Sequence, residues 1–136
     1  KEFNMMKEGH LTCSDDYEKY LEKVMDFQEK DNPISHIKKF ELVKGDATKT
    51  IHEYLNRNKE TIIALAYFDF DIYEPTKICL EAIKDRLVKG SILGFDELND
   101  PDSPGETKAV MEVFGLNNIR LKRFPYTSRC SYFVVE

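Results

Sequence analysis

Residues 62–71 read Ile-Ile-Ala-Leu-Ala-Tyr-Phe-Asp-Phe-Asp, an apolar run of strand length that ends in two carboxylates. Side chains alternate between the two faces of an extended chain, so we expect Asp69 and Asp71 to project from the same face. A strand that is apolar throughout is typical of a parallel sheet that is covered on both faces. The stretch therefore predicts a buried strand that delivers two acid groups to a site.

A second apolar run, residues 91–95, ends in Asp96 and Glu97. If the two runs are parallel neighbours, about 4.8 Å apart, all four acids meet at the carboxyl edge of the sheet, where open α/β proteins bind their ligands. Like charges that close repel one another unless they are neutralised. Oxygen ligands favour hard cations, so this edge predicts a site for Mg²⁺, Mn²⁺ or Ca²⁺.

Hydrophobic periodicity predicts alternating helices and strands along the rest of the chain. The link between the last two predicted strands is too short for a crossover helix, so these strands are expected to be antiparallel neighbours. The predicted fold class is α/β, with a mostly parallel sheet and an antiparallel C-terminal hairpin, in a single domain of residues 1–136. We expect helices over 15–30, 47–58, 75–90 and 107–114, and strands over 40–44, 61–70, 91–96, 119–124 and 131–135.

Length and composition exclude several classes of function. The chain has 136 residues, 41% of them hydrophobic, which suits one domain with a real core. A net charge of -5 argues against general binding to nucleic acid or to an anionic membrane. No apolar run approaches the roughly 20 residues that cross a bilayer. The 3 cysteines form no C-x-x-C pair, so we expect neither a disulfide framework nor a thiolate metal site, and a cytoplasmic location.

Three motifs follow one another in the sequence: Gly45-Asp46-Ala47, the run Tyr-Phe-Asp-Phe-Asp-Ile-Tyr-Glu-Pro-Thr-Lys at 67–77, and Phe95-Asp96-Glu97. Together they resemble the macrocin O-methyltransferase family, over roughly residues 40–115. Members of that family are class I enzymes that use S-adenosylmethionine to methylate sugar hydroxyls of natural products. The resemblance implies a Rossmann-like methyltransferase sheet, S-adenosylmethionine and Mg²⁺ as cofactors, and a small-molecule acceptor, a sugar.

The resemblance also implies roles for individual acids. Asp69 and Asp96 would ligate the metal ion, with Glu97 at a position where the family usually has a second Asp. Asp71 matches the position of the general base. An alternative makes Asp71 a metal ligand and gives the base role to His10 or His36.

The methyl donor would be bound at the turn after the first predicted strand. Asp46 and Ala47 match the residues that contact its adenine, and Asp69 is carried over as a third cofactor-binding residue. A second interpretation of Asp46 is a plain N-cap of the helix over 47–58, and both interpretations can hold together.

The chain departs from the family pattern at its N-terminal side. It contains no G-x-G motif, and the strands that normally carry the glycine-rich turn and the ribose-binding acid are missing. Because the first residue is Lys, we expect the chain to be the C-terminal portion of a methyltransferase domain, lacking those strands. A remodelled sheet, or a homo-oligomer in which a second chain fills the gap, is an alternative.

Other functions use the same acids. Asp-x-Asp also holds metal ions in glycosyltransferases and opens the catalytic motif of some phosphatases, although the residues that follow Asp71 here differ from the phosphatase pattern. A non-catalytic, truncated fragment that keeps the acids as relics is a further alternative.

Overall fold

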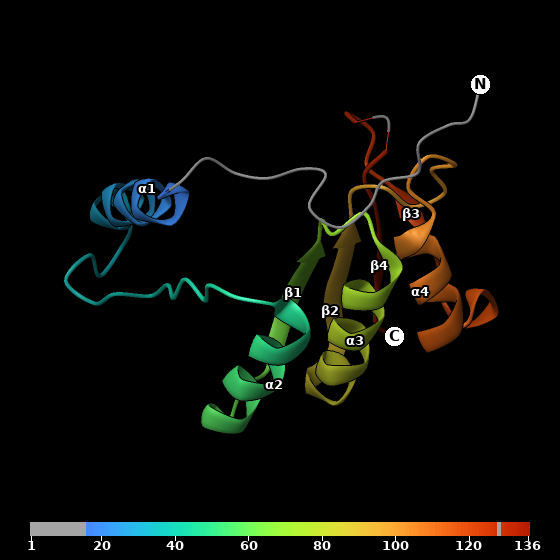
Figure 1. The fold of residues 1–136 in the computed structure, drawn as a ribbon, viewed down its shortest axis with the longest axis horizontal. Helices are drawn as coiled ribbons and strands as arrows, with labels where there is room; N and C mark the ends of the chain where they lie inside the picture. Colours follow the sequence, from blue (N-terminus) through green and yellow to red (C-terminus); the bar gives the residue numbers. More distant parts are fainter. Residues whose placement is uncertain (1–15, 128) are drawn as a thin grey trace.

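The computed structural model describes residues 16–127 and 129–136, and it shows helices and strands alternating as the periodicity predicts (Figure 1). The elements are α1 (Tyr17–Asp31), α2 (Ala47–Arg57), β1 (Ile63–Phe68), α3 (Tyr73–Ile83), the 3-10 turn η1 (Lys84–Arg86), β2 (Leu87–Phe95), α4 (Gly105–Val113), the 3-10 turn η2 (Leu116–Asn118), β3 (Lys122–Arg123) and β4 (Ser131–Val134). Within the described residues, no helix has the length and apolar character that crossing a membrane requires.

The sheet has the strand order β1-β2-β4-β3. β1 and β2 are parallel, with Phe68 opposite Phe95, while β4 pairs antiparallel with both β2 and β3. This sheet confirms the predicted α/β class and the antiparallel C-terminal hairpin, but in the described residues it is mixed, with one parallel and two antiparallel pairs of strands. β1 lies at one edge, and no described strand covers its other side.

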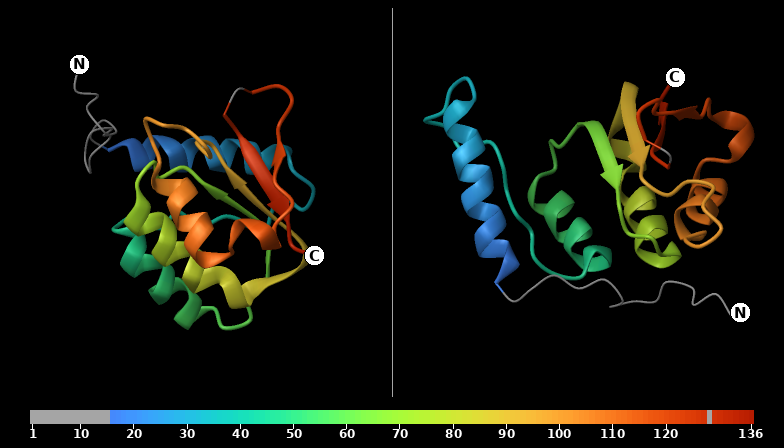
Figure 2. Two further views of the ribbon diagram at one scale, coloured as in Figure 1. Left: turned by 90° about the vertical axis from the view of Figure 1, so that its right-hand side faces the viewer. Right: turned by 90° about the horizontal axis from the view of Figure 1, so that it is seen from above.

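Helices α2, α3 and α4 lie on one face of the sheet (Figure 2). The core between them is built on three stacked rings from three strands, with centroids 5.2 Å apart for Phe68 and Phe95 and 6.1 Å apart for Phe95 and Phe133. On the other face of the sheet, Leu65 and Tyr67 of β1 are more than half exposed. The order of the sheet thus places the ends of β1 and β2 side by side, with one face buried and the other open.

Three predicted elements differ from the structure. The strand expected over 119–124 is limited to β3, Lys122–Arg123. Residues 40–44 do not form a strand, because no strand of the described residues lies beside them to complete a hydrogen-bonded ladder. Residues 87–90, expected at the end of a helix, begin β2 instead, since Val88 N–H donates to Ser91 Oγ and Gly90 N–H donates to the Val135 carbonyl. Helix α1 forms as predicted, but Tyr17 and Tyr20 of its apolar stripe are exposed.

Candidate functional site

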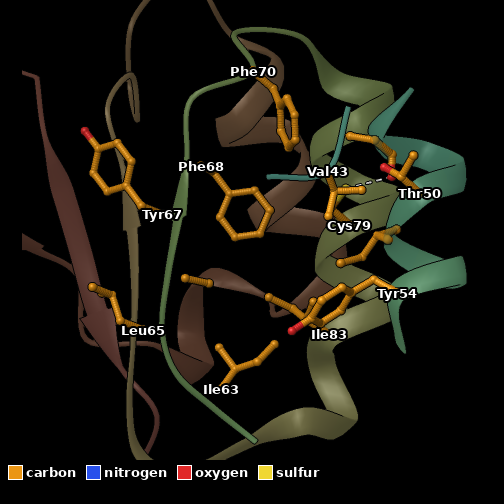
Figure 3. A pocket seen from close by; sticks show the side chains of 13 residues that line it. Val43, Thr50, Tyr54, Ile63, Leu65, Tyr67, Phe68, Phe70, Cys79 and Ile83 are labelled. Atoms are coloured by element: carbon orange, nitrogen blue, oxygen red, sulfur yellow. Dashed lines mark hydrogen bonds between the residues drawn. The ribbon is translucent and has the colours of Figure 1, made fainter. Parts of the chain in front are cut away.

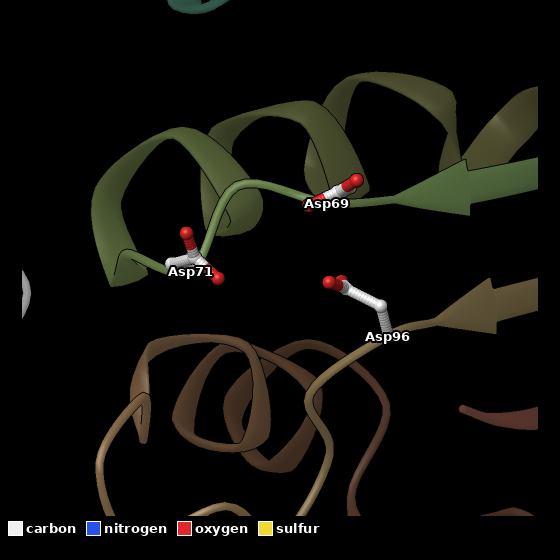
Figure 4. A group of neighbouring side chains, drawn as sticks. All are labelled: Asp69, Asp71 and Asp96. Atoms are coloured by element: carbon white, nitrogen blue, oxygen red, sulfur yellow. The ribbon is translucent and has the colours of Figure 1, made fainter. Parts of the chain in front are cut away.

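The ends of β1 and β2 bring three of the predicted acids together. The parallel register continues one residue past Phe68, where Asp96 N–H donates to the Phe68 carbonyl at 3.3 Å. Asp69, Asp71 and Asp96 each offer a carboxylate oxygen, and these oxygens lie within 4.8 Å of one another. Figure 4 shows the three carboxylates facing one another across the space between the loops that follow the two strands. The parallel pairing predicted from the two apolar runs therefore builds an acid group at the carboxyl edge.

Asp71 reaches this group by a turn and not by strand alternation. β1 ends at Phe68, and Asp71 has a left-handed backbone with φ 60°. Ile72 N–H donates to the Phe70 carbonyl at 2.6 Å, which closes a three-residue turn centred on Asp71. Such a conformation costs a non-glycine residue about 1–3 kcal/mol. The expectation that Asp69 and Asp71 share one face of a strand is corrected: the chain bends, and the bend aims Asp71 at the other acids.

Glu97 lies outside the group of three. One of its oxygens accepts a hydrogen bond from Arg129 Nη1 at 2.7 Å, and Arg129 also pairs with Asp100 at 3.1 Å. The other oxygen, Oε2, is buried without a hydrogen-bond partner among the described residues. The structure thus directs Glu97 toward Arg129, and its role as a metal ligand stays a prediction.

A fourth acid, Glu106, stands behind the group and was missed by the sequence reasoning. It lies in the first turn of α4 and is fully buried. Its Oε1 accepts from Phe70 N–H at 3.2 Å, and its Oε2 accepts from Glu97 N–H at 3.3 Å. A Glu in the first turn of a helix is common, since it complements the helix dipole, and Glu74 of α3 has the same position. Only the tertiary packing distinguishes Glu106 from Glu74.

The electrostatics of the group favour a positive partner. Burial, followed by the charge of Asp69, raises the pKa of Asp96 to about 6. Burial, followed by the charges of Glu97 and Asp69, raises the pKa of Asp71. The Asp96 Oδ1 atom is buried and has no hydrogen-bond partner within the described part of the chain. Carboxylates that repel one another, one of them with a buried oxygen that has no partner among the described residues, are suited to hold a cation.

The predicted donor-binding residues lie at the start of α2. Asp46 caps the helix: its Oδ1 accepts from Thr48 N–H at 3.0 Å and from Thr48 Oγ1 at 2.7 Å, and these bonds lower the pKa of Asp46. Ala47 lines an apolar pocket of about 340 Å³ between α2, α3 and β1. Phe68 and Phe70, which flank Asp69, line the same pocket (Figure 3). The pocket thus runs from the start of α2 to the residues that carry the acid group.

Neither of the two histidines considered as alternative bases belongs to the group of Asp69, Asp71 and Asp96 in the described residues. His10 lies outside the described residues, and His36 lies in the turn that follows α1, in the segment between α1 and α2.

Solved structures that are similar to this chain include two of the same enzyme. The apo structure of CalS11, a TDP-rhamnose 3'-O-methyltransferase in calicheamicin biosynthesis, is 44% identical over 90% of this chain, with a TM-score of 0.85. A second structure of this calicheamicin methyltransferase is 43% identical over 90%, also with a TM-score of 0.85. The chain covers 54% and 48% of those chains, so it spans about half of their length. A scan of protein-family models and a search of curated proteins find no match.

Proposed function

We propose that this chain is the C-terminal portion of an S-adenosylmethionine-dependent O-methyltransferase domain that acts, with a divalent metal ion, on a sugar hydroxyl. The observation that carries the proposal is the likeness to a sugar O-methyltransferase at 44% identity over 90% of the chain. The motifs around Asp46, Asp69 and Asp96, which resemble the macrocin O-methyltransferase family, support the same reaction. The similar enzyme is named for its action on TDP-rhamnose, so this nucleotide-linked deoxysugar is the first acceptor to test.

The acid group fits a metal ion. The three carboxylate oxygens within 4.8 Å of one another form an all-oxygen donor set, and the unpartnered Asp96 Oδ1 supplies an acceptor that no described residue satisfies. Asp69 and Asp96 would hold Mg²⁺, or Mn²⁺ or Ca²⁺, with Asp71 close by. Glu97 holds Arg129 with Oε1, and its Oε2, which has no partner among the described residues, is the oxygen that would be left for the metal ion. A bound divalent ion supplies a Lewis acid that lowers the pKa of an alcohol and fixes its orientation.

Asp71 is suited to take the proton of the acceptor hydroxyl. Its carboxylate faces the other two acids, and its raised pKa makes it a stronger base than an ordinary aspartate. The proton would move from the hydroxyl oxygen to an Asp71 carboxylate oxygen while the hydroxyl oxygen bonds to the methyl carbon, and the methyl carbon–sulfur bond of the donor would break to release S-adenosylhomocysteine. The strained turn at Asp71 fixes the direction of the base before the acceptor arrives.

The methyl donor supplies a sulfonium methyl group, and the pocket beside Ala47 supports the expected position of its adenine. The lining of this pocket is apolar and includes Phe70, a suitable surface for an aromatic base. The Asp46 Oδ1 atom caps α2, and Oδ2 pairs with the exposed Lys49 at 3.3 Å, so a ligand would share Oδ2 with this exposed ion pair. The cap and the binding role are therefore compatible.

The proposal is tested by incubating this chain, and any longer protein that contains it, with S-adenosylmethionine, TDP-rhamnose and Mg²⁺, and following the methylated sugar by mass spectrometry. Calorimetry with S-adenosylhomocysteine, with and without Mg²⁺, measures donor binding separately. Methyl transfer that depends on Mg²⁺ supports the proposal, and activity of the longer protein alone identifies this chain as an incomplete portion. Binding of a nucleotide sugar without any binding of S-adenosylhomocysteine by either protein would favour a glycosyltransferase instead.

A further inference from the structure

The first turn of α4 contacts both of the loops that carry the acid group. The carboxylate of Glu106 accepts one hydrogen bond from Phe70 N–H, at 3.2 Å, and another from Glu97 N–H, at 3.3 Å. Phe70 stands between Asp69 and Asp71, and Glu97 directly follows Asp96. One buried side chain thus joins the backbone of the two loops at the positions next to the acids.

The two hydrogen bonds to Glu106 join the loops after β1 and β2 beyond the last backbone hydrogen bond between these strands. The pairing of β1 and β2 ends with the hydrogen bond from Asp96 N–H to the Phe68 carbonyl. Past that point the two chains diverge, and no backbone bond between the loop at 69–72 and the loop at 97–100 is found in the described residues. Glu106 therefore connects the two loops by hydrogen bonds at a point where their backbones do not bond to each other.

Gly105 allows the start of α4 to lie close to the backbone of residues 71–73. A Cβ atom at this position would lie 2.5 Å from the Asp71 carbonyl oxygen and 2.5 Å from Tyr73 N. The start of α4 is thus packed directly against the turn that gives Asp71 its left-handed backbone. Since a side chain does not fit there, the helix start and the turn hold each other in place.

We propose that Glu106 is the positioning residue of the acid group: it sets the separation between the Asp69–Asp71 loop and the Asp96 loop, and so fixes the distance over which the three carboxylates can share one cation. This inference rests on the proposed metal-assisted function. The two N–H donors account for a side chain with two oxygen atoms at this position, because each donor bonds to one of them. A glutamine offers one acceptor oxygen and would turn an NH₂ group toward the other donor.

The test uses Glu106→Gln in the full chain, with Mn²⁺ alone as the probe. Glu112→Gln is the matched control, because Glu112 is on the same helix and bonds to Tyr73 and Lys77 of α3, but it contacts neither acid-bearing loop. Electron paramagnetic resonance measures free Mn²⁺, and thermal unfolding monitors the fold. We expect E106Q to weaken Mn²⁺ binding at least about tenfold, the effect usual for residues that support metal ligands, while E112Q leaves it unchanged.

A second measurement tests the hydrogen bonds of Glu106 independently of metal binding. In ¹⁵N-labelled protein without metal, E106Q should change the amide shifts and increase the hydrogen exchange of Phe70 and Glu97, and E112Q should not. Unchanged amides at both residues, or wild-type Mn²⁺ affinity in E106Q, would overturn the positioning role. If the wild-type chain binds no Mn²⁺, the metal function fails, and the amides alone then decide whether Glu106 joins the loops. Should E106Q not fold, Glu106→Asp, which keeps two acceptor oxygens on a shorter side chain, is measured in the same way.

Discussion

Replacing Asp96 by asparagine should stabilise the metal-free protein at neutral pH. The folded-state pKa of Asp96, about 6, lies above its ordinary value of 3.8, because burial and the charge of Asp69 disfavour the carboxylate. Between these two values the folded protein holds a proton that the unfolded chain has released. Stability therefore falls as the pH rises from about 4 to about 6, and the full penalty remains at higher pH. The asparagine side chain carries no charge and escapes this penalty.

The size of the effect follows from the two pKa values. The difference between 3.8 and about 6 corresponds to a ceiling of about 3 kcal/mol in the free energy of unfolding. Asp96 is only partly buried, so solvent screening reduces the expected gain to about 1–2 kcal/mol. For a chain of this length, that gain raises the Tm by about 3–6 °C.

Thermal unfolding of D96N and the wild type, at pH 7.5 and pH 4 in the presence of a chelator, provides the assay. The control is Asp85→Asn, which changes an exposed aspartate of η1. We expect D96N to have the higher Tm at pH 7.5 and an equal Tm at pH 4, with no change in D85N at either pH. A D96N variant that is less stable than the wild type at pH 7.5 would show that the acids do not repel one another in the folded state, and the reason for expecting a cation there would be lost.

Three other substitutions test separate parts of the site. Asp69→Asn should abolish Mg²⁺-dependent methyl transfer while changing the Tm by only a few degrees; an unchanged rate removes Asp69 from the mechanism. Asp71→Asn should lower kcat by about 10²–10⁴-fold, the usual contribution of a general base, with little effect on KM, and a loss confined to KM would argue for a binding role instead. Gly105→Ala should cost about 1–3 kcal/mol in urea denaturation, because its methyl group would meet the backbone of Asp71 and Tyr73 at 2.5 Å; wild-type stability would mean that α4 does not press on the turn.

The sequence predicts those parts of the site that depend on strands. An apolar run followed by Asp69, and another followed by Asp96, are sufficient to indicate parallel neighbours with acids at one edge, and the structure has this pairing. The N-cap role of Asp46 can also be predicted from the sequence, because an N-cap residue bonds to backbone groups only a few positions away. In both cases the information is local, or it repeats along the chain with a regular period.

The features that sequence reasoning missed all depend on contacts between distant residues. Glu106 is recognisable only once α4 is packed against the loops after β1 and β2. Glu97 pairs with Arg129, 32 positions away, and a pair at this separation cannot be predicted from sequence spacing. Residues 40–44 have the alternation of a strand, but alternation cannot supply a neighbouring strand, and the segment stays unpaired among the described residues.

The shared cation site is tested most directly by anomalous diffraction from crystals of this chain grown with Mn²⁺. The predicted result is one anomalous peak within bonding distance of carboxylate oxygens from Asp69 and Asp96, with Asp71 facing it. A map with no peak between these residues at saturating Mn²⁺, or with the ion bound elsewhere on the surface, would contradict the site.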